Sequence, residues 1–156
     1  MTTYYVFQFL HIAGVILLVG NITVTAVWKV FANRTQDATI IAFGQRLVTG
    51  TDFGLTIPGI ALTIIGGYGT MWMLGYPLFD DAWLIWSQIL FIAAGLIWLG
   101  ILVPIQVRQA RIARTFESVG GVTDEYRALS RRWIVWGLIS TVPLVIVLWL
   151  MVAKPG

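Results

Sequence analysis

The chain has 156 residues, of which 58% are hydrophobic and only 11% are charged. Soluble domains carry about 25% charged residues, so this composition excludes an ordinary soluble domain and is typical of an integral membrane protein. The absence of cysteine excludes disulfides, thiolate metal sites and thiol nucleophiles. The net charge of +3 does not indicate a nucleic-acid partner, because the basic residues gather in segments that fit a membrane topology.

Four apolar runs are long enough to cross a bilayer, since about 20 helical residues span its hydrocarbon core. They cover residues 4–31, 53–74, 82–107 and 133–153. The sequence therefore predicts an all-α fold: one transmembrane domain over residues 1–156, built as a four-helix bundle in the lipid bilayer.

The basic residues predict the orientation of these spans. Lys29, Arg34 and Arg46 lie at and after the inner end of the first span, and a second group follows the third: Arg108, Arg111, Arg114, Arg127, Arg131 and Arg132. The positive-inside rule then places both termini outside and the basic loops in the cytoplasm of a bacterial inner membrane. The second basic group is interpreted as a cytoplasmic anchor, and binding of anionic lipid headgroups is the sharper alternative.

The connections between the spans contain further helix signals. A short interfacial helix is predicted within residues 32–51, and Asp52 is predicted to cap the second span. The third helix is expected to continue over residues 106–117 and to break at residues 118–121. Thr123, followed by two acidic residues, then predicts the start of a new helix.

Small and polar residues follow one stripe on each predicted helix, at about 100° per residue. Such stripes let transmembrane helices approach and hydrogen-bond one another. The first stripe holds His11, Gly14, Leu18, Asn21, Thr25 and Lys29, and the second holds Asp52, Thr56, Gly59, Thr63, Gly66, Gly67 and Thr70. The third holds Ser87, Ala94 and Trp98 beside Gln88 and Gly95, and the fourth holds Trp133, Gly137, Ser140 and Leu144.

His11 is the only histidine and lies in an uncharged run, where an ionisable residue is a candidate for function. One interpretation is a packing residue that is hydrogen-bonded to Gln88, Ser87 or a backbone carbonyl. The other is an axial ligand of haem or another porphyrin, with Gly14, Gly66, Gly67, Ala94 and Gly95 making room for the macrocycle.

The apolar cores of the four runs contain no Asp, Glu, Lys or Arg, which argues against a proton pump or an ion channel. No carboxylate in the spans is expected to reach His11 as part of a nucleophile–base pair, and there is no second histidine for a multi-histidine metal site.

The segment Leu10–Gly14, followed by Gly20, resembles the first-helix signature of the HemJ-type protoporphyrinogen oxidase and CopD-like superfamily. The C-terminal stretch is similar too, with Arg132-Trp133, Pro143 and residues 150–155. The pair Pro58-Gly59 after Asp52 looks closer to a sister family of uncharacterised bacterial integral membrane proteins. These short motifs extend over nearly the whole chain.

The resemblance implies a haem b or porphyrin site on His11. The related oxidases pair this histidine with a lysine early in the third helix, after a Trp-Leu pair. Here Trp83-Leu84 is present but Ser87 stands at the matching position, so oxidase activity is left open. Met71 or Met73 could supply a second axial ligand, or the iron could be five-coordinate. CopD-like relatives suggest copper transport, but the four scattered methionines do not form a soft-ligand cluster.

The sequence thus predicts a small membrane protein with a role in redox chemistry or tetrapyrrole handling. The predicted cofactor is haem b, with His11 as axial iron ligand and with a site formed by His11, Gly14, Met71, Ser87 and Gln88. The alternative is a non-catalytic accessory subunit of a larger membrane complex, or a homo-oligomer, whose stripes serve only helix packing. A small transporter or channel is the third interpretation.

Overall fold

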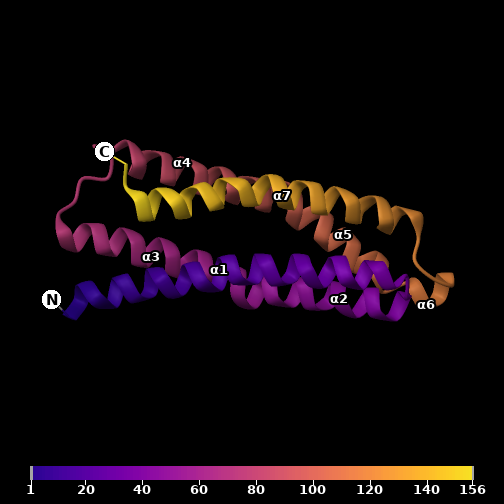
Figure 1. Cartoon of the computed structure of the whole chain (residues 1–156). Coiled ribbons are helices and arrows are strands. Elements are labelled where there is room, and N and C mark those ends of the chain that lie inside the picture. Colours follow the sequence, from indigo (N-terminus) through magenta and orange to yellow (C-terminus); the bar gives the residue numbers. More distant parts are fainter. Residues whose placement is uncertain (1, 156) are drawn as a thin grey trace. The chain divides into compact units, whose positions relative to one another are not determined.

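The computed structural model describes residues 2–155, and within this range all regular elements are helices. The predicted all-α fold with four long apolar helices is confirmed. These helices are Thr2–Thr35, Ala38–Leu74, Ala82–Ala113 and Asp124–Ala153, and each is long and apolar enough to cross a membrane. They form two compact units, residues 1–76 and residues 77–156, and each unit is one antiparallel helix pair (Figure 1).

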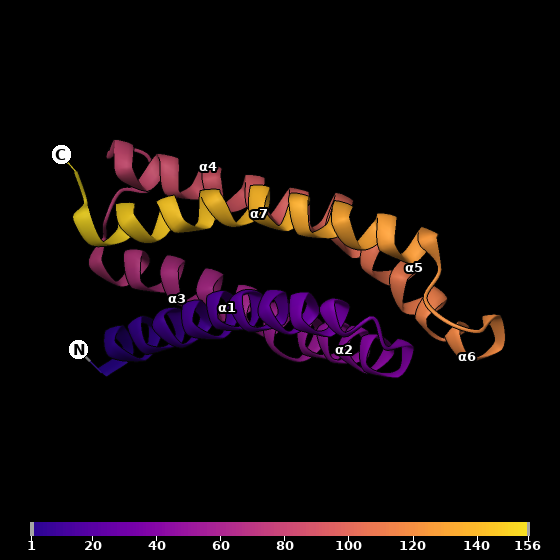
Figure 2. The same ribbon diagram turned by 45° about the vertical axis from the view of Figure 1, so that its right-hand side comes forward.

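In the first unit, α1 (Thr2–Thr35) packs against a second long helix that has three parts. These parts are α2 (Ala38–Thr51), the π-helical segment η1 (Asp52–Thr56) and α3 (Ile57–Leu74), and Figure 2 shows α1 alongside them. Asp37 caps α2, because its carboxylate accepts the backbone N–H groups of Thr39 at 2.7 Å and Ile40 at 3.1 Å. The helix predicted within residues 32–51 is therefore present, but it runs directly into the next span.

Two prolines explain the interruptions of the long helices. Each π-helical segment, η1 (Asp52–Thr56) and η2 (Trp98–Leu102), ends two residues before a proline, Pro58 or Pro104. Proline donates no backbone N–H, and its ring crowds the carbonyl four residues earlier. A wider turn relieves this conflict. The backbone N–H of Ile57 accordingly bonds the carbonyl of Asp52 five residues back.

The predicted cap role of Asp52 is wrong. The helix that begins at Ala38 continues through this position, so no helix end remains for the carboxylate to cap. Asp52 is instead buried, with 7% of its surface exposed, and its carboxylate receives side-chain hydrogen bonds.

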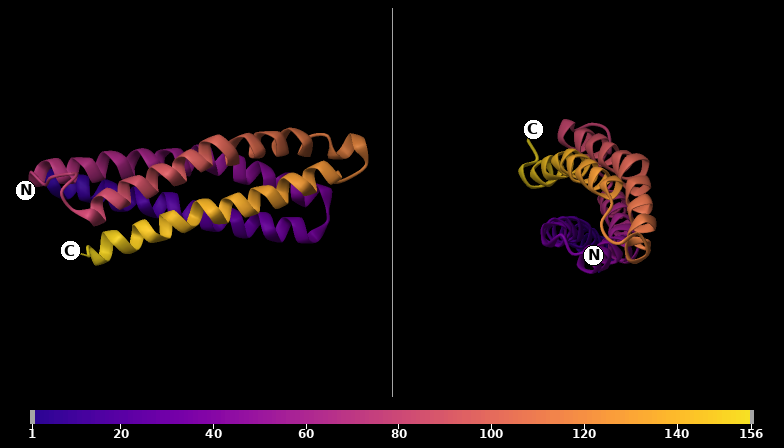
Figure 3. Two further views of the ribbon diagram at one scale, coloured as in Figure 1. Left: turned by 90° about the horizontal axis from the view of Figure 1, so that it is seen from above. Right: turned by 90° about the vertical axis from the view of Figure 1, so that its right-hand side faces the viewer.

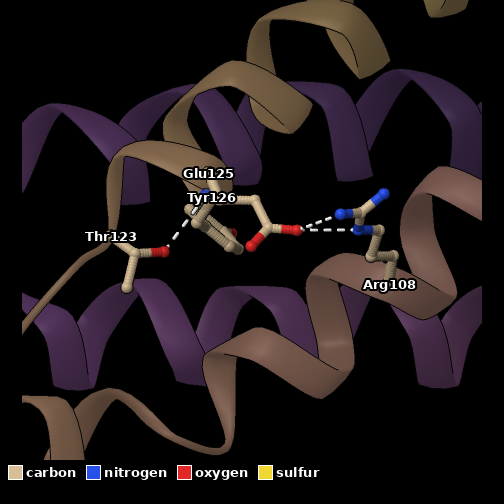
Figure 4. A network of polar contacts seen from close by, with 4 residues as sticks. All are labelled: Arg108, Thr123, Glu125 and Tyr126. Atoms are coloured by element: carbon tan, nitrogen blue, oxygen red, sulfur yellow. Dashed lines mark hydrogen bonds and ion pairs between the residues drawn. The ribbon is translucent and has the colours of Figure 1, made fainter.

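The second unit pairs α7 (Asp124–Ala153) with α4 (Ala82–Ile97), η2 and α5 (Val103–Ala113), as the two views of Figure 3 show. The short helix α6 (Phe116–Val119) follows α5 and ends at Gly120, whose φ of 78° suits glycine. The helix predicted over residues 106–117 ends earlier, at Ala113, and residues 118 and 119 are helical in α6. The break predicted at residues 118–121 is therefore confirmed only at Gly120 and Gly121. Thr123 caps α7 by accepting the backbone N–H of Tyr126 at 3.3 Å, and the Arg108 guanidinium binds the Glu125 carboxylate across the helix pair (Figure 4).

The predicted stripes coincide with the buried faces of the four long helices. The buried residues of α1 are Gly14, Leu18, Asn21, Thr25 and Lys29, and those of η1 and α3 are Asp52, Thr56, Gly59, Thr63 and Gly66. Ser87 and Ala94 are buried on α4, and Trp133, Ser140 and Leu144 are buried on α7. Large apolar side chains point outward, for example Phe9 and Trp149. This inside-out distribution fits helices whose outer surface meets lipid.

Candidate functional site

Glycines bring the backbones of α1 and α3 into direct contact. A Cβ atom added at Gly59 would lie 2.9 Å from the backbone nitrogen of Leu18. At Gly66 it would overlap the backbones of Phe7 and His11, and at Gly14 it would overlap Thr63. Small residues at such positions permit close helix approach. The space left by Gly14 and Gly66 is therefore filled by the facing helix.

The imidazole of His11 lies across this contact and is half-buried. Its Nδ1 is 2.8 Å from the backbone carbonyl oxygen of Thr63. A carbonyl only accepts hydrogen bonds, so Nδ1 is the donor, and the neutral ring keeps its lone pair on Nε2. Of the three hydrogen-bond partners that the sequence suggested for His11, the structure shows the backbone carbonyl.

Gly67 is the residue that admits the ring. A Cβ atom at this position would lie 3.0 Å from Nδ1 of His11 and 3.2 Å from Cε1. Even the methyl group of alanine would therefore push against the imidazole. The tautomer and the position of the ring are thus determined by two neighbours on α3, the carbonyl of Thr63 and the missing side chain of Gly67.

This arrangement presents Nε2 as a potential metal ligand. Among the described residues, no hydrogen bond is made to this atom. Metal-binding histidines commonly donate their other ring N–H to a backbone carbonyl or a carboxylate, which orients the ring and fixes the tautomer. No group of three or more His, Asp or Glu side chains that could hold a metal ion occurs within residues 2–155. A single imidazole suits a cofactor that brings its own equatorial ligands, as haem does.

Met71 lies four residues beyond Gly67, so it shares the face of α3 on which the imidazole rests. Its side chain is half-buried, whereas that of Met73 is 41% exposed on another face of the helix. Met71 is therefore the better placed of the two predicted thioether ligands.

Ser87 and Gln88 belong to α4 of the second unit. The Ser87 hydroxyl donates to the carbonyl of Trp83 at 2.7 Å. The Gln88 amide donates to the carbonyls of Leu78 at 3.0 Å and Leu84 at 3.3 Å. Both side chains thus use their donors within their own unit, and their predicted role as cofactor contacts remains a prediction.

A second cluster, the inner polar layer, consists of Asn21, Lys29, Gln45, Asp52 and Thr56. The Asn21 amide donates to Asp52 Oδ1 at 3.0 Å and to Thr56 Oγ1 at 2.8 Å, and the Thr56 hydroxyl donates to Asp52 Oδ1 at 3.0 Å. The Lys29 amine donates to the Gln45 carboxamide oxygen. None of the five residues is more than 7% exposed.

The stripes predicted from the sequence contain four of these five residues, all but Gln45, but the hydrogen-bonded layer that they form was not predicted. Charged residues were expected only outside the apolar cores of the spans, yet Lys29 and Asp52 are buried in the first helix pair. The physical reason is that α1 and α2 extend beyond the apolar runs, so residues at the ends of those runs become interior positions. The available signal was the helical stripe, because both residues fall on the stripes that face the partner helix.

The chain belongs to the family described as "Predicted integral membrane protein (DUF2269)", whose model matches residues 5–155. Comparison with curated proteins and with solved structures gave no match. The family description agrees with the four long apolar helices and establishes a multi-pass integral membrane protein.

Proposed function

We propose that this membrane protein binds haem b through Nε2 of His11 and acts in electron transfer or tetrapyrrole handling. The observation that carries the proposal is the bond from His11 Nδ1 to the Thr63 carbonyl, which leaves a fixed nitrogen lone pair on the opposite edge of the ring.

The residues around His11 have distinct roles in the proposal. The Thr63 carbonyl fixes the tautomer, Gly67 makes space for the ring, and Met71 supplies a second ligand if the iron is six-coordinate. The contact at Gly14 and Gly66 holds α1 and α3 together, so the imidazole sits on a rigid support. Haem bound there would supply one-electron chemistry or be carried as cargo.

The proposal is one of binding and does not include protoporphyrinogen oxidation. In the HemJ-type oxidases that the first-helix motif resembles, a lysine stands at the position where this chain has Ser87. A hydroxyl carries no positive charge, and the Ser87 hydroxyl is already bonded to the Trp83 carbonyl. The accessory-subunit role is the competing function, and it predicts a colourless protein in a larger assembly that the His11→Ala variant leaves intact.

Titration of the purified protein with haemin tests the proposal. Wild-type protein is expected to shift and sharpen the Soret band of the added haemin in a saturable manner, and His11→Ala is expected to leave the spectrum of free haemin unchanged. Gln8→Ala is the matched control, because Gln8 is also a half-buried polar residue on α1, one turn earlier. A haemin spectrum that the wild-type protein does not change, or equal haemin affinity in all three proteins, would overturn the proposal.

We further propose that the basic segments face the cytoplasm, as the positive-inside rule predicts, which places His11 toward the outer leaflet. The chain has no native cysteine, so single cysteines can report its topology. Asp80→Cys and Ser118→Cys alter exposed positions in the connections before α4 and before α7. In intact cells a membrane-impermeant maleimide should label only the cysteine at position 80. Labelling of the cysteine at position 118 alone would show that the chain has the opposite orientation in the membrane.

A further inference from the structure

The second unit carries an exposed cluster of arginines that the haem proposal does not use. Residues 103–133 contain six arginines and no lysine, against three carboxylates. Arg108 pairs with Glu125, and Arg127 lies 3.9 Å from Asp124. The other four arginines form no ion pair with the described residues. They are named here the arginine surface: Arg111, Arg114, Arg131 and Arg132.

The arginine surface lies where the apolar part of each helix ends. Arg131 and Arg132 directly precede Trp133, where the apolar run of α7 begins. Arg111 and Arg114 lie three residues apart at the end of α5, which continues the apolar helix α4. In a membrane-spanning pair, this boundary is the level of the lipid headgroups, where tryptophan and basic residues gather.

An exposed ion pair, between Arg108 and Glu125, lies one helical turn from Arg111. It joins α5 to the first turn of α7, close to the capping bond of Thr123 (Figure 4). It also neutralises one of the carboxylates, so that Glu125 does not compete for the neighbouring guanidinium groups. The four residues of the arginine surface form no ion pair with the described residues, so their charges are available to an external anion.

We infer that the arginine surface binds the phosphate groups of anionic phospholipids in the adjacent leaflet. A guanidinium presents a planar fork of donors that matches phosphate oxygens in a bidentate manner, and arginine is preferred over lysine where this geometry matters. Phospholipid is the occupant favoured by position, because the bilayer holds headgroups at the level of the arginines at all times. The inference is independent of haem binding at His11.

The test is retention of added lipid by the purified full-length protein, counted by native mass spectrometry. The probes are phosphatidylglycerol, which is anionic, and phosphatidylcholine, which is zwitterionic. Wild-type protein should retain phosphatidylglycerol preferentially. The double variant Arg111→Gln/Arg114→Gln should lower this preference by roughly tenfold, because each arginine near a membrane surface adds to the attraction for anionic lipid.

The matched control is Arg34→Gln/Arg46→Gln, which also removes two arginines and leaves the arginine surface intact. The guanidinium groups of Arg34 and Arg46 lie over the rings of Phe31 at 5.7 Å and Phe43 at 5.9 Å. This control should keep the wild-type preference. Raising the salt from about 0.1 M to about 0.5 M should weaken the preference of the wild-type protein, since salt screens exposed charges.

Three results would overturn the inference. The first is equal retention of the two lipids by the wild-type protein, and this result does not depend on whether a variant folds. The second is an equal loss of preference in both double variants, which would show a general effect of net charge. The third is full displacement of the lipid by inorganic phosphate, which would assign the surface to soluble anions.

Discussion

Two polar regions, the surroundings of His11 and the inner polar layer, both include residues on the buried stripe of α1. They differ in how many of their polar atoms are hydrogen-bonded to the described residues. At His11, one ring nitrogen bonds the Thr63 carbonyl and the other makes no hydrogen bond to the described residues. In the inner polar layer, Asn21, Asp52 and Thr56 are each bonded to the other two. The first region is half-buried and open, whereas the second is buried and closed.

The comparison shows that burial of a polar residue does not by itself mark a functional site. Asp52 and Lys29 would attract attention first, because ionisable residues inside membrane helices are candidates for function. Their hydrogen bonds instead account for them as links between α1 and the second long helix. His11 differs because only one of its two ring nitrogens is hydrogen-bonded to the described residues, and the other is the atom that we propose as a haem ligand.

The largest expected effect on stability comes from removing a hydrogen-bond acceptor from the inner polar layer. Asp52→Ala removes the oxygen that accepts from Asn21 and Thr56, leaving both donors buried without it. Each orphaned group costs about 1–3 kcal/mol, so we expect a total loss of about 3 kcal/mol in the free energy of unfolding. Denaturant unfolding followed by tryptophan fluorescence measures it, with Asp80→Ala as the exposed control.

Asp52→Ala should leave the haemin affinity unchanged, because the carboxylate does not contact His11. A stability close to that of the wild-type protein would show that the inner polar layer does not hold the helix pair. A selective loss of haemin binding without loss of stability would make Asp52 part of the site, and the contrast between the two regions would fail.

A smaller effect is expected from Gly67→Ala, which disturbs the open region alone. The added methyl group would press on the imidazole at about 3.0 Å from Nδ1. We expect roughly a tenfold loss of haemin affinity, or about 1.4 kcal/mol, because the ring must shift from its anchored position. Isothermal titration with haemin measures the change.

Gly20→Ala is the control for Gly67→Ala, since a Cβ atom at Gly20 would meet nothing within 4 Å. Its haemin affinity should equal that of the wild-type protein. Equal haemin affinities of the wild-type protein and the two glycine variants would show that Gly67 is not part of the haem site.

The smallest effect is expected at the exposed ion pair of the second unit. The side chains of Arg108 and Glu125 are 64% and 50% exposed, and such pairs typically contribute less than about 1 kcal/mol. Arg108→Gln should therefore destabilise the protein much less than Asp52→Ala in the same unfolding assay. A loss of stability as large as that caused by Asp52→Ala would show that buried polar contacts do not stabilise this protein more than exposed ones.

Much of the fold could be predicted from the sequence, because membrane helices are recognised by long apolar runs in which small and polar residues recur about every 3.6 residues. The four spans, the cap at Thr123 and the buried stripes all follow from local pattern. The π-helical segments could not be predicted in this way. Pro58 indicates a distortion, but whether the chain kinks, breaks or widens one turn depends on packing against α1.

The site was predictable only in part. His11 stands out as the single histidine, and its stripe identified the face it shares with Gly14. Its partner, the Thr63 carbonyl, depends on the register between two antiparallel helices, which no local pattern contains. The polar side chains of Ser87 and Gln88 drew attention instead, because a backbone carbonyl has no signature in the sequence.

Chemical rescue tests whether Nε2 of His11 is a haem ligand. His11→Gly removes the imidazole while leaving space for a free one, and the absorption spectrum of the haemin-treated variant is then recorded with and without added imidazole. We expect the spectrum of free haemin without imidazole and recovery of the wild-type spectrum with it. A wild-type spectrum in His11→Gly without imidazole, or no recovery in a variant that remains folded by circular dichroism, would contradict it.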